Sequence, residues 1–164
     1  MKPHCVLLLV ALTLASSHSA AVDRPEPPPG VGTAEARART VVDALRAGKP
    51  ELANAFFFPA AEFGEVKAAK DPGAIFRRLI GLYHGDLLAL RKTLKDPEHV
   101  EFVSFRLANG RNWIERFKEA NKLPYWAVYG STVMLRDAGR LVTVKVRVMI
   151  SWKGQWVVTH LTRK

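Results

Sequence analysis

Two residues near the C-terminal end of the chain, Arg147 and His160, have side chains whose chemistry could be combined in one site. They lie in two strand-like runs of alternating apolar and polar residues, separated by the dipeptide Lys153-Gly154. A two-residue turn at this dipeptide would place residue 151 opposite residue 156, and therefore Arg147 opposite His160. The arginine could then hold an anionic ligand, and the histidine could act as a general base.

The same face of this hairpin would carry Met149, Val158 and Trp156, a partly apolar lining that suits a small organic ligand. We add Tyr125 to the lining because it begins a strand and would lie near the mouth of a pocket. A shift of one residue in the register would separate the arginine from the histidine. In the alternative interpretation, both of these residues lie on the solvent side of an edge hairpin and form no site.

Other titratable residues provide weaker signals. Glu62 and Glu65 flank Gly64 and could point into the mouth of a pocket, although most glutamates in such positions are simply solvated. The histidines after residue 21 are far apart in the sequence, and none forms a His-x-x-x-His pair, so we expect no metal site. The chain has no nucleophile elbow, phosphate-binding loop or dinucleotide fingerprint, and no cofactor is expected.

The elements that must position these residues fall into two groups. Apolar residues at helical spacing predict helices in the N-terminal half, over residues 33–48, 50–56 and 73–94. β-Branched and aromatic residues predict strands later in the chain, over residues 100–110, 125–136, 141–152 and 155–162. Between them, Trp113, Ile114 and Phe117 recur at helical spacing. Residues 111–120 are therefore predicted as a short helix, with an irregular strand as the alternative.

This order predicts an α+β domain with a cone-like shape, in which N-terminal helices pack on one face of a curved, mostly antiparallel sheet. The strand over residues 125–136 is apolar on both sides, which indicates a sheet that is covered on both faces. The aromatic triplet at residues 56–58 cannot direct all three rings to one neighbour. We interpret it as a junction between a helix and the core rather than as an exposed patch.

The first 21 residues have the three-part pattern of a secretory signal peptide. A basic start precedes the apolar run Cys5–Ala15, which is too short to span a bilayer, and small residues allow cleavage after Ala21. Residues 22–32 are predicted as a Pro/Gly-rich linker and residues 33–164 as a single domain. Cys5 is the only cysteine, so the mature chain would have no disulfide, which suits a periplasmic or secreted bacterial protein.

The formal net charge of the chain is +10. Its lysines and arginines are scattered rather than gathered in one long block, so we expect no nucleic-acid partner. A solvated basic surface is one explanation of this charge. Weak association with an anionic envelope surface is the other.

Two segments carry a resemblance to a known superfamily: ARTVVDALRAGKPELANAFFFP at residues 38–59 and VTVKVRVMISWKGQWVVTHL at residues 142–161. The order of helices and strands that they begin and end resembles the nuclear transport factor 2-like (SnoaL-like) superfamily, and the whole chain is similar to exported bacterial proteins. The resemblance implies a pocket between the concave sheet face and the helices. It also implies that many members bind ligands or dimerise through the sheet, and that some are enzymes.

We therefore expect an exported, non-enzymatic domain that binds a small anionic or apolar ligand or a partner protein, with a homodimer through the sheet. One alternative is a pocket enzyme of the isomerase, dehydratase or hydrolase type, with His160 as its base and Arg147 as the holder of an anion. The other alternative is a basic envelope-associated protein.

Overall fold

The computed structural model describes residues 24–28 and 32–162, and side chains as far as Leu161. The predicted signal peptide, with Cys5 and the cleavage site after Ala21, lies outside this part, as do some residues of the predicted linker. The described linker residues 24–28 have no regular structure, and the Pro25 carbonyl accepts a hydrogen bond from the Trp126 indole at 2.8 Å. Among the helices of this part, none combines the length and hydropathy needed to cross a bilayer.

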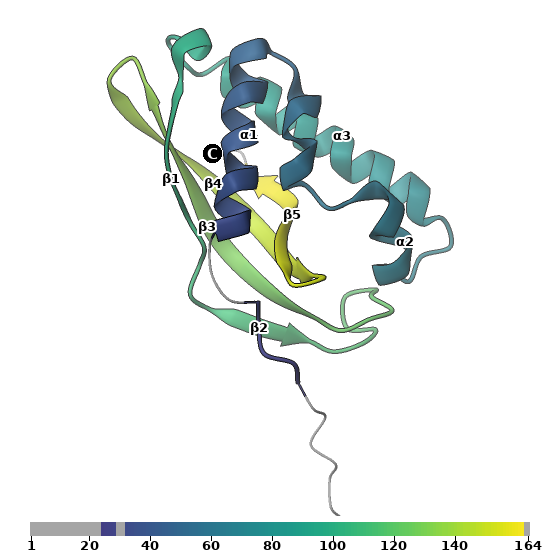
Figure 1. Cartoon of the computed structure of the whole chain (residues 1–164). Helices are drawn as coiled ribbons and strands as arrows, with labels where there is room; N and C mark the ends of the chain where they lie inside the picture. The colour runs from purple at the N-terminus through teal and green to yellow at the C-terminus, as the bar shows by residue number, and fades with distance from the viewer. Residues whose placement is uncertain (1–23, 29–31, 163–164) are drawn as a thin grey trace, which may run out of the picture.

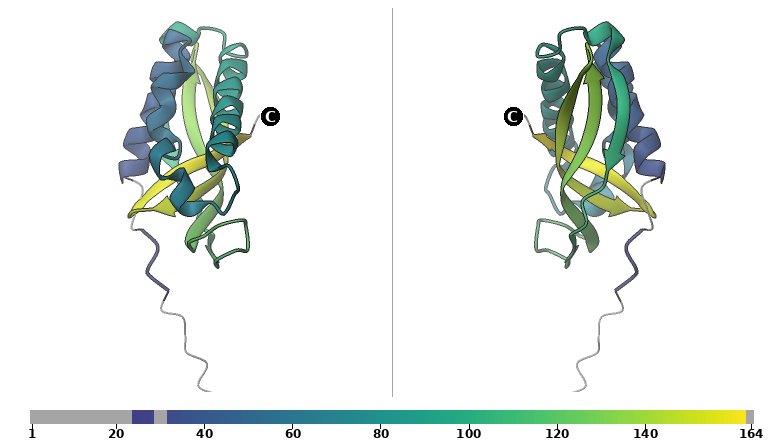
Figure 2. Two further views of the ribbon diagram at one scale, coloured as in Figure 1. Left: turned by 90° about the vertical axis from the view of Figure 1, so that its right-hand side faces the viewer. Right: turned by 90° about the vertical axis from the view of Figure 1, so that its left-hand side faces the viewer.

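The helices lie on one side of the sheet (Figures 1 and 2). α1 (Gly32–Ala47) buries an apolar stripe, and Gly48 follows it in the left-handed conformation that ends many helices. α3 (Pro72–Arg91) begins with proline in its first turn, and the Asp71 carboxylate accepts a hydrogen bond from the Ala74 N–H at 2.8 Å. The shorter helical segments are η1 (Pro50–Phe56), η2 (Ala60–Glu62), α2 (Phe63–Val66) and η3 (Pro97–His99).

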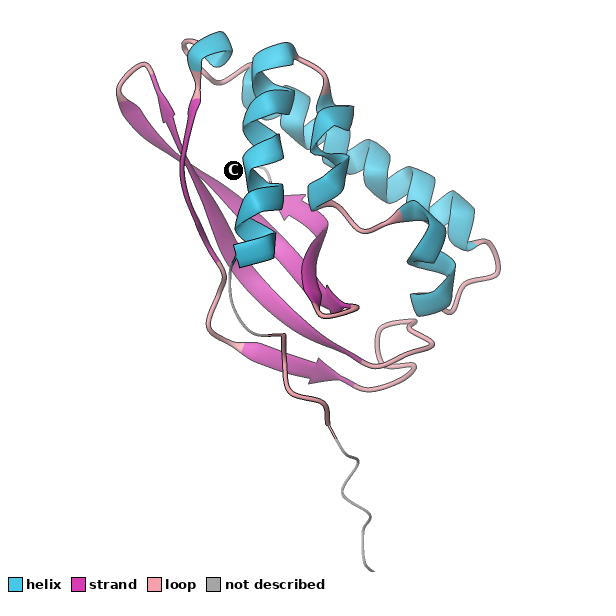
Figure 3. Ribbon diagram, in the orientation of Figure 1, coloured by secondary structure: helices cyan, strands magenta, loops and turns pink. Residues whose placement is uncertain are grey.

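The sheet is antiparallel in every pairing and has the order β1-β3-β4-β5, with β2 paired to β3 as well (Figure 3). Its strands are β1 (Glu101–Arg106), β2 (Arg111–Ile114), β3 (Tyr125–Asp137), β4 (Arg140–Trp152) and β5 (Gln155–Thr162). Helices therefore precede strands and cover one face of a curved sheet. The α+β prediction is confirmed. Of the four predicted helical segments, those over residues 33–48, 50–56 and 73–94 are confirmed.

The predicted helix over residues 111–120 is wrong. Residues 111–114 form β2 and pair with β3, so that Trp113 lies opposite Trp126 with the two ring centroids 5.2 Å apart. The chain then turns through an irregular loop in which Phe117 has φ 63° and Ala120 has φ 51°. A helix excludes both values, so packing on β3 overrides the helical spacing of the apolar residues.

The aromatic triplet is buried completely, and each ring has a different neighbour. Phe56 packs against Phe105 and Phe58 against Phe63, each with ring centroids 5.8 Å apart, while Phe57 packs against Tyr83 at 4.9 Å. This is possible because the chain leaves η1 in an extended conformation, in which successive side chains point in opposite directions. The interpretation of the triplet as a junction between helix and core is confirmed.

α3 is packed less closely on the sheet than its length suggests. Only Tyr83 and Leu87 are buried among its twenty residues, whereas Leu79 and Leu90 are half-buried and Leu82 is 53% exposed. The helix therefore leaves space between itself and the sheet. Two hollows lie there, one near its N-terminal half and one near its C-terminal half.

Candidate functional site

The hairpin of β4 and β5 turns at the predicted dipeptide, but it does not keep a regular register. Ser151 lies opposite Trp156 as predicted, and the same register continues to Met149. An irregularity then places His160 opposite Val148 instead of Arg147. The predicted pairing of Arg147 with His160 is therefore wrong, because the register of the two strands shifts between Val146 and Met149.

This irregularity separates the residues that were predicted to line one pocket. Met149 and Trp156 are buried in the core, and Arg147 is exposed, so none of the three lines a hollow with His160. Tyr125 and His160 do line a common hollow, beneath the N-terminal half of α3. Of the candidate ligand-binding residues, the structure thus brings only Tyr125 to the candidate base.

The hollow around His160 is small, with a volume of about 120 Å³. Its other polar residues are Lys67, Glu119, Tyr129 and Thr159, and its apolar residues are Leu79, Val148 and Ile150. The Tyr125 hydroxyl donates a hydrogen bond to Glu119 Oε2 at 2.9 Å and accepts one from Lys67 Nζ at 3.1 Å. The Tyr129 hydroxyl donates to Glu119 Oε1 at 3.2 Å. The polar groups of this hollow therefore bind one another.

The charge state of this cluster follows from its surroundings. Burial lowers the pKa of Lys67, and the nearby Glu119 carboxylate opposes that shift. Partial burial lowers the pKa of His160 below 6.5, and the positive charges of Arg147 and Lys67 lower it further. Both effects favour the neutral imidazole, the form that can accept a proton.

The two glutamates near the aromatic triplet are engaged with the end of the hairpin. Glu62 accepts a hydrogen bond from the Trp152 indole, and its carboxylate lies 3.1 Å from Lys153 Nζ. The Glu65 carboxylate lies 4.0 Å from the same ammonium group. In the part of the chain that the structure describes, no group of three or more His, Cys, Asp or Glu side chains could hold a metal ion.

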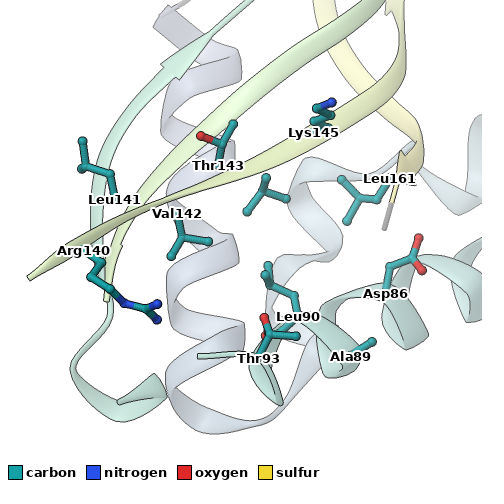
Figure 4. Close-up of a pocket in the computed structure, with 11 residues that line it drawn as sticks. Asp86, Ala89, Leu90, Thr93, Arg140, Leu141, Val142, Thr143, Lys145 and Leu161 are labelled. Carbon is teal, nitrogen blue, oxygen red and sulfur yellow. The ribbon is translucent and has the colours of Figure 1, made fainter. Parts of the chain in front are cut away.

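A larger hollow lies between the C-terminal half of α3 and the N-terminal part of β4, residues 140–145, with a volume of about 510 Å³ (Figure 4). We call it the β4 groove. The residues of α3 and its C-terminal extension that line it are Asp86, Ala89, Leu90 and Thr93. The strand residues that line it are Arg140, Leu141, Val142, Thr143, Val144, Lys145 and Leu161. No sequence prediction placed a site here.

Among the described residues, one edge of β4 has no pairing partner along this groove. β5 pairs with β4 only from Lys145 to Trp152, and no described residue pairs with residues 140–144 on that side. The backbone of this stretch therefore offers hydrogen-bonding groups toward the groove, as the edge strand of any sheet does.

Charged side chains lie at both ends of the open stretch. Arg140 binds the buried Asp137 carboxylate at 3.2 Å but keeps about half of its side chain exposed. Lys145 is exposed where β5 begins to pair with β4. Between them, Leu141 is 61% exposed and Val142 is half-buried. The groove is therefore lined by apolar and polar side chains, including the carboxylate of Asp86, and a cation lies at each end of the unpaired stretch of β4.

Comparisons with protein-family models, with curated proteins and with solved structures find no match for this chain. The resemblance to the nuclear transport factor 2-like superfamily stays a prediction. The function must accordingly be inferred from the geometry of the two hollows.

Proposed function

We propose that this chain is an exported, non-enzymatic binding domain that takes an extended segment of a partner protein along the β4 groove. The observation that carries the proposal is the edge of β4 at residues 140–144, which no described residue pairs with, next to a hollow of about 510 Å³. Export rests on the signal-peptide pattern of residues 1–21.

The size of the two hollows favours the β4 groove over the hollow at His160. Pockets that bind organic ligands have volumes of roughly 300–1,000 Å³, a range that includes the groove but not the hollow of about 120 Å³. In the smaller hollow, Tyr125, Glu119 and Lys67 already bind one another. A substrate for His160 would have to displace these contacts, which supports binding rather than catalysis.

An extended peptide matches the β4 groove better than a compact ligand does. A peptide in β conformation can satisfy the unpaired backbone edge, and its side chains can contact Leu141, Val142 and the other apolar lining residues at every second position. The exposed cations Arg140 and Lys145 lie at the two ends of the unpaired stretch and complement acidic residues on either side of the bound segment. The expected partner segment is therefore a few apolar residues in extended conformation, flanked by acidic ones.

The test is a selection from a peptide-display library, followed by hydrogen exchange. Selected peptides should share an apolar core with acidic flanks. Binding should slow the amide exchange of residues 140–144, because the added strand supplies hydrogen bonds to that edge. A selected peptide that protects other residues, or a failure to select any such peptide, would contradict the proposal. A small amphiphile that fills the groove without protecting this edge would contradict it too.

A matched pair of substitutions, one on α3 and one in the turn that follows it, provides the control. Thr93→Trp places a large ring at the groove lining, at an exposed position where it is expected to leave the fold intact. Leu88→Trp places the same ring on α3 at an exposed position that does not line the groove. We expect the first variant to weaken peptide binding at least tenfold and the second to bind like the wild type, with equal melting temperatures.

A further inference from the structure

The loop between β2 and β3 displays a phenylalanine to solvent. Phe117 is 66% exposed, and its backbone has φ 63°, a left-handed conformation that costs an aromatic residue about 1–2 kcal/mol. Leu123, later in the same loop, is 41% exposed. Neither a strained backbone nor an exposed apolar side chain stabilises the fold, so packing does not explain why this residue is a phenylalanine.

The loop is nevertheless held in one shape. Asn121 is buried at its centre, where its side-chain amide donates to the carbonyls of Glu115 and Leu123 and its oxygen accepts from the Glu119 N–H. The Phe117 N–H donates to the Asn121 carbonyl at 2.8 Å. These bonds fix the position of the phenylalanine ring at the surface of the loop.

Three cations belong to the same loop as the exposed ring, and one of them lies over it. The Arg116 guanidinium lies 5.1 Å from the centroid of the Phe117 ring and donates to the Lys122 carbonyl at 2.8 Å. Lys118 and Lys122 are exposed as well. The two carboxylates of the loop are already engaged elsewhere: Glu115 lies 3.6 Å from Arg24, and Glu119 accepts hydrogen bonds from two tyrosines. The loop therefore exposes apolar side chains and carries a net positive charge, three cations against two carboxylates.

We propose that this loop, residues 115–124, binds the surface of an anionic lipid bilayer. Exposed apolar side chains flanked by cations match the boundary between acyl chains and anionic head groups. A soluble acidic polymer would engage the cations but would leave Phe117 and Leu123 in water. The described linker residues reach this end of the molecule, where Arg24 contacts Glu115 and Pro25 contacts Trp126.

The test uses the full chain with a spin label at residue 120. Cys5→Ser removes the only cysteine, and Ala120→Cys then directs the label to an exposed loop position while keeping Phe117, Leu123 and the three cations. We expect vesicles rich in phosphatidylglycerol to shield this label severalfold from a water-soluble relaxation agent, whereas phosphatidylcholine vesicles do not. A label at the exposed residue Thr143, on β4, should remain accessible with both lipids.

The contribution of the cations has its own variant. Replacing Arg116, Lys118 and Lys122 with glutamine should raise the lipid concentration that half-shields the label by about a hundredfold, at roughly fivefold per removed cation. A label that stays accessible on anionic vesicles would overturn the proposal. So would equal shielding with neutral lipid or in the triple variant, and so would binding to soluble polyphosphate without binding to vesicles.

Discussion

At the scale of single residues, His160 shows how neighbours decide the state of a group that the sequence alone marks as reactive. Partial burial lowers its pKa first, and the charges of Arg147 and Lys67 add to the shift. The sequence predicted that Arg147 would lie beside this histidine to hold a ligand. In the structure Arg147 acts on it only through its charge, since His160 lies opposite Val148.

Arg147→Gln should therefore raise the pKa of His160 toward its ordinary value of 6.5, as measured by the pH titration of its ring protons in NMR spectra. Because the folded-state pKa lies below the unfolded one, the wild type loses stability as the pH falls from 6.5 through the folded-state pKa. The variant should lose less over that range. Arg106→Gln, another exposed arginine of the sheet, should leave the titration of His160 unchanged.

Asp137 is a second residue whose role the sequence did not reveal. The sequence places it at a hairpin turn, where most carboxylates are solvated, yet its side chain is fully buried. It accepts hydrogen bonds at 2.8 Å from the backbone N–H groups of Lys95 and Asp96, and one from Arg140 at 3.2 Å. These bonds lower its pKa and connect the end of β3 to the chain after α3.

Asp137→Asn should lower the melting temperature at pH 7 by about 5 °C, since the amide cannot accept all three bonds as a carboxylate does. The pKa of Asp137 is lower in the folded state than the ordinary 3.8, so its stabilisation is present above pH 3.8 and is lost as the pH falls through the folded-state value. The difference between the two proteins should therefore narrow in acid. Asp71→Asn, which keeps a good helix cap, is the control, and equal melting of all three proteins would contradict this role.

At the scale of elements, the sequence predicts whatever depends on local pattern. The alternation of residues 141–152 and the Lys153-Gly154 turn were sufficient for the hairpin and for the pairing of residues 151 and 156. The sequence did not predict the irregularity near His160, because a bulge depends on how the strands curve against other elements. It predicted a strand over residues 111–120 only as the alternative to a helix, because only the pairing with β3 makes residues 111–114 extended. The β4 groove was not predicted for the same reason, because its lining comes from α3, β4 and β5, and only the packing of these elements brings it together.

The loop after β2 depends on Asn121 for its shape. Asn121→Ala would leave the Glu119 N–H and the carbonyls of Glu115 and Leu123 without their partner. We expect a loss of about 2–3 kcal/mol in the free energy of unfolding, measured by urea denaturation. Asn112→Ala, at an exposed position of β2, should cost less than about 0.5 kcal/mol. A similar small loss in Asn121→Ala would mean that the loop is held by its backbone contacts alone.

At the scale of the whole molecule, the charge of +10 bears on every partner that the chain could have. On the sheet face away from the helices, Arg106 and Lys145 lie on either side of Thr132, and both are exposed. Arg111 is exposed near the same face, opposite Val128. A symmetric homodimer through this face would bring the cation-bearing surfaces of the two copies together.

We therefore expect association of two copies through the sheet to be weakest at low ionic strength and to strengthen as salt is added, as measured by sedimentation velocity. Salt at about 0.1 M reduces the screening length to about 10 Å and so weakens the repulsion between the two faces. Binding of the loop at residues 115–124 to anionic vesicles should change in the opposite direction, because salt weakens that attraction. A dimer that dissociates on addition of salt would show that the two copies meet through surfaces of opposite charge, and the sheet face would then be excluded as the interface.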